Sequence, residues 1–409
     1  MNKAGRYLRR TIEPRLTQAA AEFPALVLTG PRQSGKTTVL RRLFGRTHGY
    51  VSLELPDVRA AAVADPRGFL RQYAPPVMFD EVQFVPQLLP YIKEAIDAAR
   101  GGKGLYLLTG SQNLLLMQQV TESLAGRAAV LHLLPLSCRE IVGKPGAGLP
   151  WETMTGATRH PALSGPPLWQ GFLRGGYPEL WAATERDPVL WLSSYLQTYL
   201  ERDVRQLRQV GDLTQFQTFL RALAARSAQL LNVTDLGRDL GVAANTVRAW
   251  LSVLEATHQI AIVRPYFANI GKRLVKTPKV YFTDVGLLCH LVGLRDARHA
   301  AAGPMGGAIF ETAVFLELRK TLWHRGDDAP IYFWRTATGT EVDFLVERQG
   351  GLVPVEAKAG ATPQTGTASA ILACQGDLGN QALPGYVVHG GDIRLPLAPG
   401  VTAVPFGAF

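Results

Sequence analysis

Cysteine, acidic residues and long apolar runs are scarce in this chain of 409 residues. Its three cysteines, Cys138, Cys289 and Cys374, lie far apart and form no CxxC pair, which excludes a disulfide framework and a structural zinc site and favours a reducing compartment. The sequence has no uncharged run of the roughly 18 apolar residues that a membrane-spanning helix needs, and no apolar segment follows the basic N-terminus. We therefore predict a cytoplasmic protein without a membrane partner.

The residue types that are abundant indicate a globular chain of several domains. Apolar residues make up 47% of the chain and charged residues 19%, which excludes disorder. A single core stops growing near ~250 to 300 residues, so more than one domain is needed. Lys and Arg number 43 against 33 Asp and Glu, a net charge of +10, which favours a polyanionic partner such as DNA.

The patterning divides the chain into five segments of an α/β protein. Residues 1–145 alternate short apolar runs with amphipathic stretches, which is typical of a parallel sheet covered by helices. Residues 146–170 are rich in Gly and Pro and predict a linker, and residues 171–225 predict a helical lid subdomain. Residues 226–295 give the order helix, turn, helix, hairpin of a winged helix-turn-helix, and residues 296–409 form a further α/β unit.

A phosphate-binding loop follows the apolar run that starts at Ala25. The sequence fits the pattern G-x-x-x-x-G-K-[ST] at every position, between a predicted strand and a predicted helix. Backbone N–H groups of such a loop converge on phosphate oxygens at a helix N-terminus. The candidate ATP-binding residues are Gly30, Pro31, Arg32, Gln33, Ser34, Gly35, Lys36, Thr37 and Thr38. Lys36 is expected at the β- and γ-phosphates, and the Thr37 hydroxyl at Mg²⁺.

Hydrolysis of ATP needs a metal carboxylate and a polarised water. Asp80 ends an apolar run and is the second predicted Mg²⁺ ligand, and Glu81 beside it is predicted to activate the water. Ser111 closes the next predicted strand and is a candidate sensor of the γ-phosphate, with a simple turn as the alternative. Arg127 at a helix end is a candidate to stabilise transition-state charge on a neighbouring subunit's nucleotide, with a plain surface arginine as the alternative.

These motifs, together with Ser123 to Arg127 and Phe172 to Pro178, resemble a family of bacterial and archaeal AAA-type ATPases whose C-terminal part is a domain of unknown function. The resemblance spans nearly the whole chain. It implies an AAA+ fold, Arg127 as an arginine finger, and a tendency to assemble into homo-oligomeric rings, a hexamer among them. Arg174 matches the lid arginine of such ATPases only loosely in its spacing.

The predicted winged helix-turn-helix carries candidate DNA-binding residues in two places. Its second helix would expose polar groups opposite an apolar stripe, and the basic run between Arg264 and Lys279 lies where the wing should be. The candidates are Asn245, Thr246, Arg248, Lys272, Arg273, Lys276 and Lys279. Lys and Arg there would supply salt-sensitive affinity for phosphates. Winged helices also act as protein-docking modules, which is the alternative.

The last segment holds a constellation that resembles the core of PD-(D/E)xK nucleases. Asp343 lies on one predicted strand, and Glu356 and Lys358 share a face of the next because they are two residues apart. Glu311 on the preceding predicted helix could add a third acid for a metal. The sequence departs from the motif because no proline precedes Asp343. The alternative is a hairpin with satisfied surface charges, in a fold that survives without nuclease activity.

The predicted function is an AAA+ ATPase with ATP and Mg²⁺ as cofactors that couples hydrolysis to action on DNA. Branched or junction DNA fits this prediction, with translocation, branch migration or remodelling as the action. Two alternatives remain open: a signalling ATPase whose C-terminal half binds protein, and an ATP-regulated, metal-dependent nuclease. Stimulation of ATP turnover by DNA distinguishes the first reading from the second, and metal-dependent nicking singles out the third.

Overall fold

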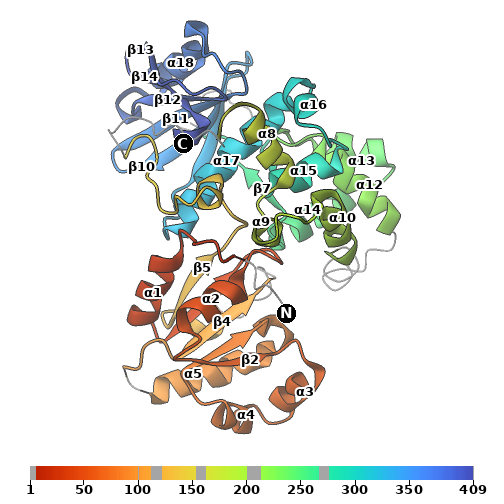
Figure 1. Cartoon of the computed structure of the whole chain (residues 1–409), viewed down its shortest axis with the longest axis vertical. Helices are drawn as coiled ribbons and strands as arrows, with labels where there is room; N and C mark the ends of the chain where they lie inside the picture. The colour runs from red at the N-terminus through yellow and green to blue at the C-terminus, as the bar shows by residue number, and fades with distance from the viewer. Residues whose placement is uncertain are drawn as a thin grey trace.

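The computed structural model describes residues 6–99, 101–111, 122–152, 163–199, 213–266 and 276–408, and the elements below are those of this described part. None of its helices is long and apolar enough to cross a membrane. Figure 1 shows the N-terminal sheet and its helices at one end of the molecule, and the later helices and the C-terminal sheet at the other.

The N-terminal unit is built on a parallel sheet of order β2-β3-β4-β1-β5. The strands are β1 (Ala25–Thr29), β2 (Gly49–Ser52), β3 (Val77–Asp80), β4 (Tyr106–Gly110) and β5 (Ala128–His132). The helices are α1 (Glu13–Glu22), α2 (Lys36–Phe44), α3 (Pro56–Ala64), α4 (Pro66–Gln72) and α5 (Leu89–Ala98). The predicted α/β class with a parallel sheet is confirmed.

Both faces of this sheet are covered, which explains why its strands are continuously apolar. Alternate residues of β1 point to opposite faces, so Leu26 and Leu28 pack with α1 and α2 in one cluster. Ala25 and Val27 pack with residues of α3, α4 and α5 in another. Every residue of β1 is buried. Because the strands are parallel, the residues that follow β1, β3 and β4 meet at one edge of the sheet.

Short helices follow the sheet. They are α7 (Cys138–Ile141), α8 (Gly165–Arg174), α9 (Pro178–Ala182), α10 (Pro188–Tyr199) and α12 (Leu213–Ala224). Helix α8 begins at Gly165, inside the stretch that composition assigned to a linker, because proline fits the first turn of a helix and Leu168 and Phe172 have a core to enter. The predicted helical lid subdomain also includes residues 200–212, which lie outside the described residues.

The middle unit combines helices with a small antiparallel sheet of order β6-β8-β7. Its elements are β6 (Gln229–Leu230), α13 (Val233–Leu240), α14 (Ala244–Ala256), β7 (Ile260–Val263), β8 (Lys279–Phe282), α15 (Val285–Leu291) and α16 (Ala297–Ala302). The Asn232 side chain accepts hydrogen bonds from the first turn of α13, and Gly241 ends that helix in the left-handed conformation. Val247, Leu251 and Leu254 of α14 face the core.

The C-terminal unit is a mixed sheet of order β13-β14-β12-β11-β10-β9 between two long helices. Its elements are α17 (Gly306–His324), β9 (Ile331–Arg335), β10 (Glu341–Arg348), β11 (Gly351–Lys358), α18 (Ser369–Leu378), β12 (Gly385–His389), β13 (Leu395–Ala398) and β14 (Val401–Pro405). The 3-10 turns are η1 (Val82–Phe84), η2 (Pro86–Leu88), η5 (Thr365–Ala368), η6 (Gly379–Gln381) and η7 (Phe406–Ala408).

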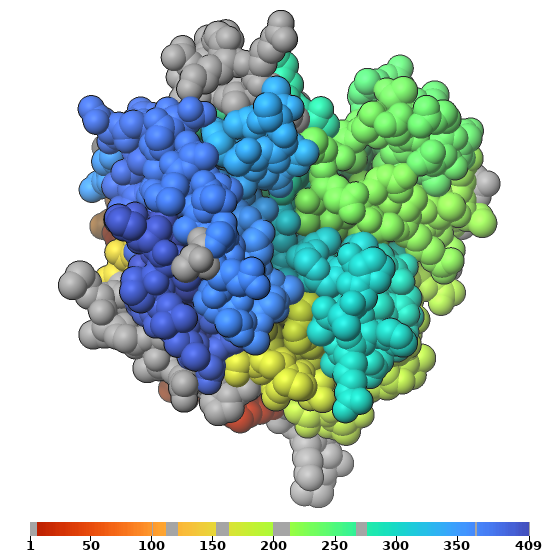
Figure 2. Space-filling view, turned by 90° about the horizontal axis from the view of Figure 1, so that it is seen from above, coloured from red at the N-terminus to blue at the C-terminus, as the bar shows by residue number. Residues whose placement is uncertain are grey.

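Helix α17 is buried on nearly all sides because three units surround it. Its Phe310 and Phe315 belong to a core cluster that includes α8, α14 and β11 residues, and α17 also contacts β5 of the N-terminal sheet. In Figure 1, α17 runs from the C-terminal sheet down towards the N-terminal unit. Figure 2 shows the C-terminal unit (blue) and the helices of residues 213–256 (green) side by side on the face seen from above.

Candidate nucleotide site and C-terminal acid cluster

The loop between β1 and α2 has the backbone of a phosphate cradle. Gly30 and Gly35 adopt positive φ angles of 147° and 94°, and Gln33 one of 61°. A Cβ at Gly30 would lie 2.1 Å from the Leu133 carbonyl oxygen, so only glycine fits there. Pro31 and Ser34 are buried, whereas Arg32, Gln33 and Thr38 line the cleft above the loop with Gly35, Lys36 and Thr37. The nine predicted residues therefore form the loop after β1 and the first turn of α2, as their contiguous motif requires.

The predicted lysine and metal ligands lie together at this edge of the sheet. Lys36 Nζ donates to the carbonyl oxygens of Gly30 at 2.9 Å and Pro31 at 2.8 Å. The Thr37 hydroxyl donates to Asp80 Oδ1 at 2.9 Å. Asp80 is 8% exposed and also accepts from Tyr50 and Thr109. A hydroxyl and a carboxylate held side by side at the start of α2 are the oxygen donors that Mg²⁺ prefers, so these residues fit the ion.

Glu81 is held in an ionised state beside this pair. It has a positive φ of 57°, and its backbone N–H donates to the Thr109 hydroxyl at 3.1 Å. Its carboxylate accepts from Ser111 at 3.3 Å and from Gln83. Burial raises the pKa of Glu81, but the charge of Lys36 and the hydrogen bond from Gln83 outweigh burial, and the pKa lies below its usual value. The predicted Ser111 thus contacts the predicted base.

Helices α9 and α10 close the other side of the cleft, which sequence reasoning missed. The cleft measures about 570 Å³. Opposite the P-loop it is lined by Glu179, Trp191, Ser194, Tyr195 and Thr198. The signal in the sequence was the i, i+4 spacing of Ser194 and Thr198, which puts both hydroxyls on one face of α10. The Arg174 guanidinium is not at the cleft: it donates to the carbonyl oxygens of Leu180 and Thr184, so it does not serve as the lid arginine here.

Arg127 lies at the opposite edge of the sheet from the P-loop. It directly precedes β5, and its carbonyl accepts from Ala25 N, the first residue of β1. Its side chain is 34% exposed and pairs with Asp97, with Nε 2.6 Å from Oδ1. The hydrogen bond and the charge of Asp97 raise the pKa of Arg127, against a smaller lowering by desolvation. A whole strand separates Arg127 from the cleft of its own chain, so it cannot reach that nucleotide site.

A buried polar network ties the P-loop to helix α17. The Arg10 guanidinium donates to the Ser34 carbonyl oxygen at 2.8 Å and to Glu140 at 3.1 Å. Glu140 also pairs with the His324 ring at 3.3 Å, and the Leu134 N–H donates to that ring at 3.1 Å. Although burial raises the pKa of Glu140, Arg10 and His324 hold it far below its usual value. The N-terminal segment therefore fixes the P-loop against the last turn of α17.

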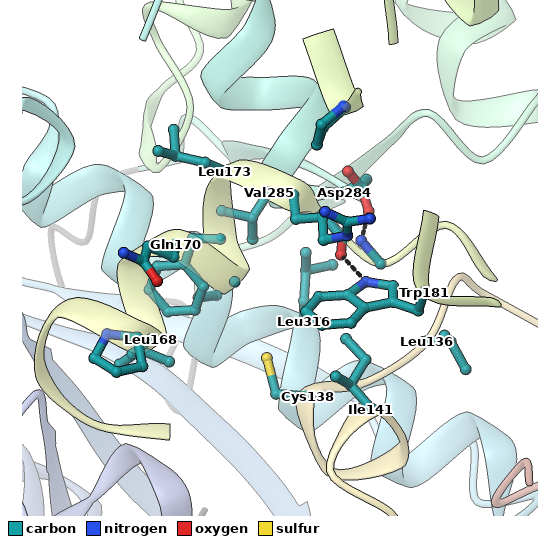
Figure 3. Close-up of a pocket in the computed structure, with 18 of the residues that line it drawn as sticks. Leu136, Cys138, Ile141, Leu168, Gln170, Leu173, Trp181, Asp284, Val285 and Leu316 are labelled. Carbon is teal, nitrogen blue, oxygen red and sulfur yellow. Dashed lines mark hydrogen bonds between the residues drawn. The ribbon is translucent and has the colours of Figure 1, made fainter. Parts of the chain in front are cut away.

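A second cavity, of about 490 Å³, lies between the N-terminal unit and the later helices (Figure 3). Leu136 and Ile141 line it from one side, Leu168 and Leu316 from α8 and α17. Two polar side chains at this cavity form hydrogen bonds to backbone groups. Trp181 donates to the Gly175 carbonyl oxygen at 2.7 Å, and Asp284 accepts from Gly176 N at 2.7 Å. It lies at a junction where α8 and α15 approach closely.

The predicted DNA-binding residues fall into three groups. Asn245 and Arg248 are exposed on α14 and hydrogen-bonded to each other at 2.7 Å, and Thr246 beside them is half-buried. Lys276 is exposed after the segment 267–275, and Lys272 and Arg273 lie within that segment, outside the described residues. The prediction for Lys279 was wrong, because its side chain is only 3% exposed and cannot contact a phosphate. Lys279 opens β8, whose every residue is buried.

Lys279 is buried among the acids predicted for the nuclease-like site. Its Nζ lies 2.8 Å from Glu311 Oε1 and 3.6 Å from Asp343 Oδ1, and it also pairs with Glu341. Tyr281, on the same face of β8, donates to Glu311 at 2.6 Å. The structure therefore brings the acids together, but around a lysine from the middle unit.

The second half of this cluster is a lysine–glutamate pair on β11. Lys358 Nζ lies 2.6 Å from Glu356 Oε1, and Asp343 accepts from Ala357 N at 2.9 Å. Burial and the Asp343 charge raise the pKa of Glu311 and of Glu356 to about 8. Among the described residues, no group of three or more His, Cys, Asp or Glu side chains has the arrangement of a metal site.

Three family models match successive parts of the chain. An AAA domain matches residues 22–142, a domain of unknown function (DUF8612) residues 166–298, and another (DUF4143) residues 306–409. The uncharacterized proteins Rv2008c of Mycobacterium tuberculosis and Mb2031c of Mycobacterium bovis are each 33% identical over 97% of this chain and 83% of their own length. The chain belongs to their family. The AAA domain and the P-loop together support nucleotide binding and ATPase function.

More distant proteins match as well. The uncharacterized protein MJ1544 of Methanocaldococcus jannaschii is 22% identical over 78% of this chain and 71% of its own length. The Walker-type ATPase PABY2304 of Pyrococcus abyssi, a solved structure, is 17% identical and covers 71% of this chain and 98% of its own, with a TM-score of 0.47. These family relatives are uncharacterized, so they do not indicate which process ATP hydrolysis would drive.

Proposed function

We propose that the protein hydrolyses ATP with Mg²⁺ and couples the reaction to action on DNA. The observation that carries the ATPase part is the cleft in which Lys36, Thr37, Asp80 and Glu81 meet. The loop's backbone N–H groups and Lys36 would bind the phosphates, for which Lys36 must leave the carbonyl oxygens it now contacts. Thr37 and Asp80 would hold Mg²⁺, which supplies neutralisation of phosphate charge.

Glu81 is the group in the cleft that is suited to accept a proton from water. Its pKa is lowered, so it is ionised at neutral pH, and Ser111 and Gln83 fix its direction. Ser111 contacts Glu81, which places it to report on the γ-phosphate through the base. Helix α10 lines the cleft on the side opposite the P-loop.

Arg127 serves in trans in this proposal. Because it lies at the far edge of its own sheet, it can act only on the nucleotide of a neighbouring copy, as in a homo-oligomeric ring. Its exposed pair with Asp97 would have to open on assembly, which costs little because solvent screens exposed ion pairs.

The middle unit is the proposed DNA reader. Helices α13 and α14 with the sheet β6-β8-β7 have the element order of a winged helix. The exposed Asn245 and Arg248 lie on α14, and the exposed Lys276 precedes β8. The C-terminal unit, a helix followed by three antiparallel strands, a helix and a parallel strand, resembles a nuclease fold and is proposed to add DNA affinity.

A gel-shift panel of single-stranded, duplex, forked and four-way DNA, with and without a non-hydrolysable ATP analogue, tests the DNA part. We expect binding that falls steeply with salt and DNA that raises the ATPase rate. Absence of DNA binding at low salt would instead favour a signalling ATPase with a protein-binding C-terminal half. Metal-dependent nicking in the same tubes would identify an ATP-regulated nuclease.

A further inference from the structure

The acid cluster of the C-terminal unit already holds a cation, and this cation belongs to another unit. Lys279 comes from β8 of the middle unit, and Glu311, Glu341 and Asp343 come from α17 and β10. With 3% of its side chain exposed, the ammonium is enclosed by carboxylates and shielded from solvent. The contact therefore joins two units through a buried charge.

An ammonium and a divalent ion compete for one position in such a cluster. Carboxylate oxygens are the preferred ligands of hard divalent cations. The lysine ammonium has three N–H donors and no acceptor, and it lies within hydrogen-bonding distance of Glu311 and Glu341 and 3.6 Å from Asp343. A divalent ion added to the same enclosed position would be repelled by the ammonium only a few ångströms away. The cluster is therefore closed to metal while Lys279 stays in place.

The charges of the cluster show what the loss of Lys279 would leave behind. Its four carboxylates, Glu311, Glu341, Asp343 and Glu356, are paired with three cations, Lys279, Lys358 and Arg335. Without Lys279, only Lys358 and Arg335 would remain as partners, and Glu311, Glu341 and Asp343 would lose the cation that they share. Lys358 cannot replace Lys279, because it already pairs with Glu356 and is half exposed.

We propose that Lys279 is a built-in cation that closes this acid cluster, and that the cluster accepts Mg²⁺ or Mn²⁺ only when the lysine side chain is removed or withdrawn. Separation of the middle unit from the C-terminal unit would withdraw it, because lysine and acids belong to different units. This inference rests on neither ATP hydrolysis nor DNA binding, so it stands or falls separately from the proposed function.

The test compares Mn²⁺ binding by the full-length parental chain, Lys279→Met and Lys276→Met, without nucleotide. Lys276→Met is the matched control, since it removes an exposed lysine three residues away. We expect Lys279→Met to bind one Mn²⁺ more than either of the others, and millimolar Mn²⁺ to raise its melting temperature by several degrees. Adding Glu311→Gln to Lys279→Met should abolish both gains, because the double variant loses a ligand.

Two results would overturn the proposal. A folded Lys279→Met that binds no additional Mn²⁺ means that the cluster is no cation position. A parental chain that binds Mn²⁺ and loses it on Asp343→Asn means that Lys279 does not close the cluster. Should Lys279→Met unfold in metal-free buffer, recovery of its fold in Mn²⁺ supports the proposal, and Lys279→Gln, which keeps a polar group of similar length, is judged by the same two criteria.

Discussion

The chain contains two sites built from acids and a lysine, and they differ in where the lysine lies. In the nucleotide cleft, Lys36 rests on backbone carbonyl oxygens, and Asp80 and Glu81 keep an open side towards the cleft. In the C-terminal cluster, Lys279 is enclosed by the acids themselves. In the proposed function the first lysine exchanges these carbonyl oxygens for a phosphate, whereas the second is itself the bound cation. The same residue types thus prepare one site for a ligand and close the other.

The largest expected effect comes from breaking the open site. Lys36→Ala should abolish nucleotide binding, because the loop loses its charge for the β- and γ-phosphates. Glu81→Gln should still bind ATP but hydrolyse it ~10² to 10⁴ times more slowly, the usual contribution of a general base. Equilibrium binding of a fluorescent ATP analogue and a phosphate-release assay separate the two effects. Turnover of Glu81→Gln at the parental rate would remove Glu81 from its assigned role.

The second prediction tests whether Arg127 of a neighbouring subunit contributes to the nucleotide site. Arg127→Ala should lower ATP turnover by ~10³ or more if Arg127 acts as a finger in trans. Mixing Arg127→Ala with Lys36→Ala should restore part of the activity, because some interfaces then pair an intact Lys36 with an intact Arg127. Asp97→Asn is the control, since it breaks the ion pair and leaves the arginine free to act. Mixed proteins that exchange subunits and stay inactive would contradict the assignment.

The difference between the two sites also marks what the sequence could predict. The P-loop, Asp80, Glu81 and Ser111 were predictable, because the motif is contiguous and follows strands that end at one edge of a parallel sheet. Helix α17, the predicted helix that carries Glu311, was likewise predictable from local sequence. Contacts between distant segments left no such signal: the covering of the cleft by α10 and the pairing of Arg127 with Asp97 depend on how helices pack.

Lys279 shows how a local pattern misleads. It ends a basic run, so charge counting grouped it with the exposed Lys276 as a phosphate contact. It also begins the apolar strand Val280 to Phe282, in which residues two apart share a face. Lys279 and Tyr281 accordingly point the same way and both reach Glu311. The strand pattern is compatible with burial of Lys279, but Glu311, the partner that stabilises the buried charge, is about 30 residues away in the sequence.

A smaller effect is expected from the exposed half of that basic run. Lys276→Glu should weaken binding to all DNA sequences alike and flatten the dependence of log affinity on log salt by about one unit, if one phosphate contact is lost. Lys272→Glu and Arg273→Glu should act in the same direction. Lys103→Glu on the N-terminal unit is the matched control, as it reverses an exposed charge far from the middle unit. If Lys276→Glu and Lys103→Glu lose DNA affinity equally, the loss is due to the change in net charge and not to a phosphate contact of Lys276.

The smallest expected effect is on the pH dependence of stability, in which Glu311 and Glu81 should differ. The pKa of Glu311 is raised to about 8 by burial and the Asp343 charge, whereas that of Glu81 is lowered. Between about pH 4.5 and 8 the folded chain therefore holds a proton on Glu311 that the unfolded chain has released, so this group makes the free energy of unfolding fall as pH rises. The slope is at most about 1.4 kcal/mol per pH unit for one proton.

Glu311→Gln should remove this contribution, because the amide keeps an oxygen for Lys279 and Tyr281 but does not titrate. Urea unfolding at pH 6.0 and 7.5 should show a shallower fall in stability for Glu311→Gln than for the parental chain. Glu81→Gln is the matched control. Because the pKa of Glu81 is lowered, this group makes stability depend on pH only below about pH 4.5, so the slope of Glu81→Gln between pH 6.0 and 7.5 should equal the parental slope. A Glu311→Gln slope equal to that of the parental chain would mean that Glu311 is fully ionised beside Lys279, and that the cluster is held by charge alone.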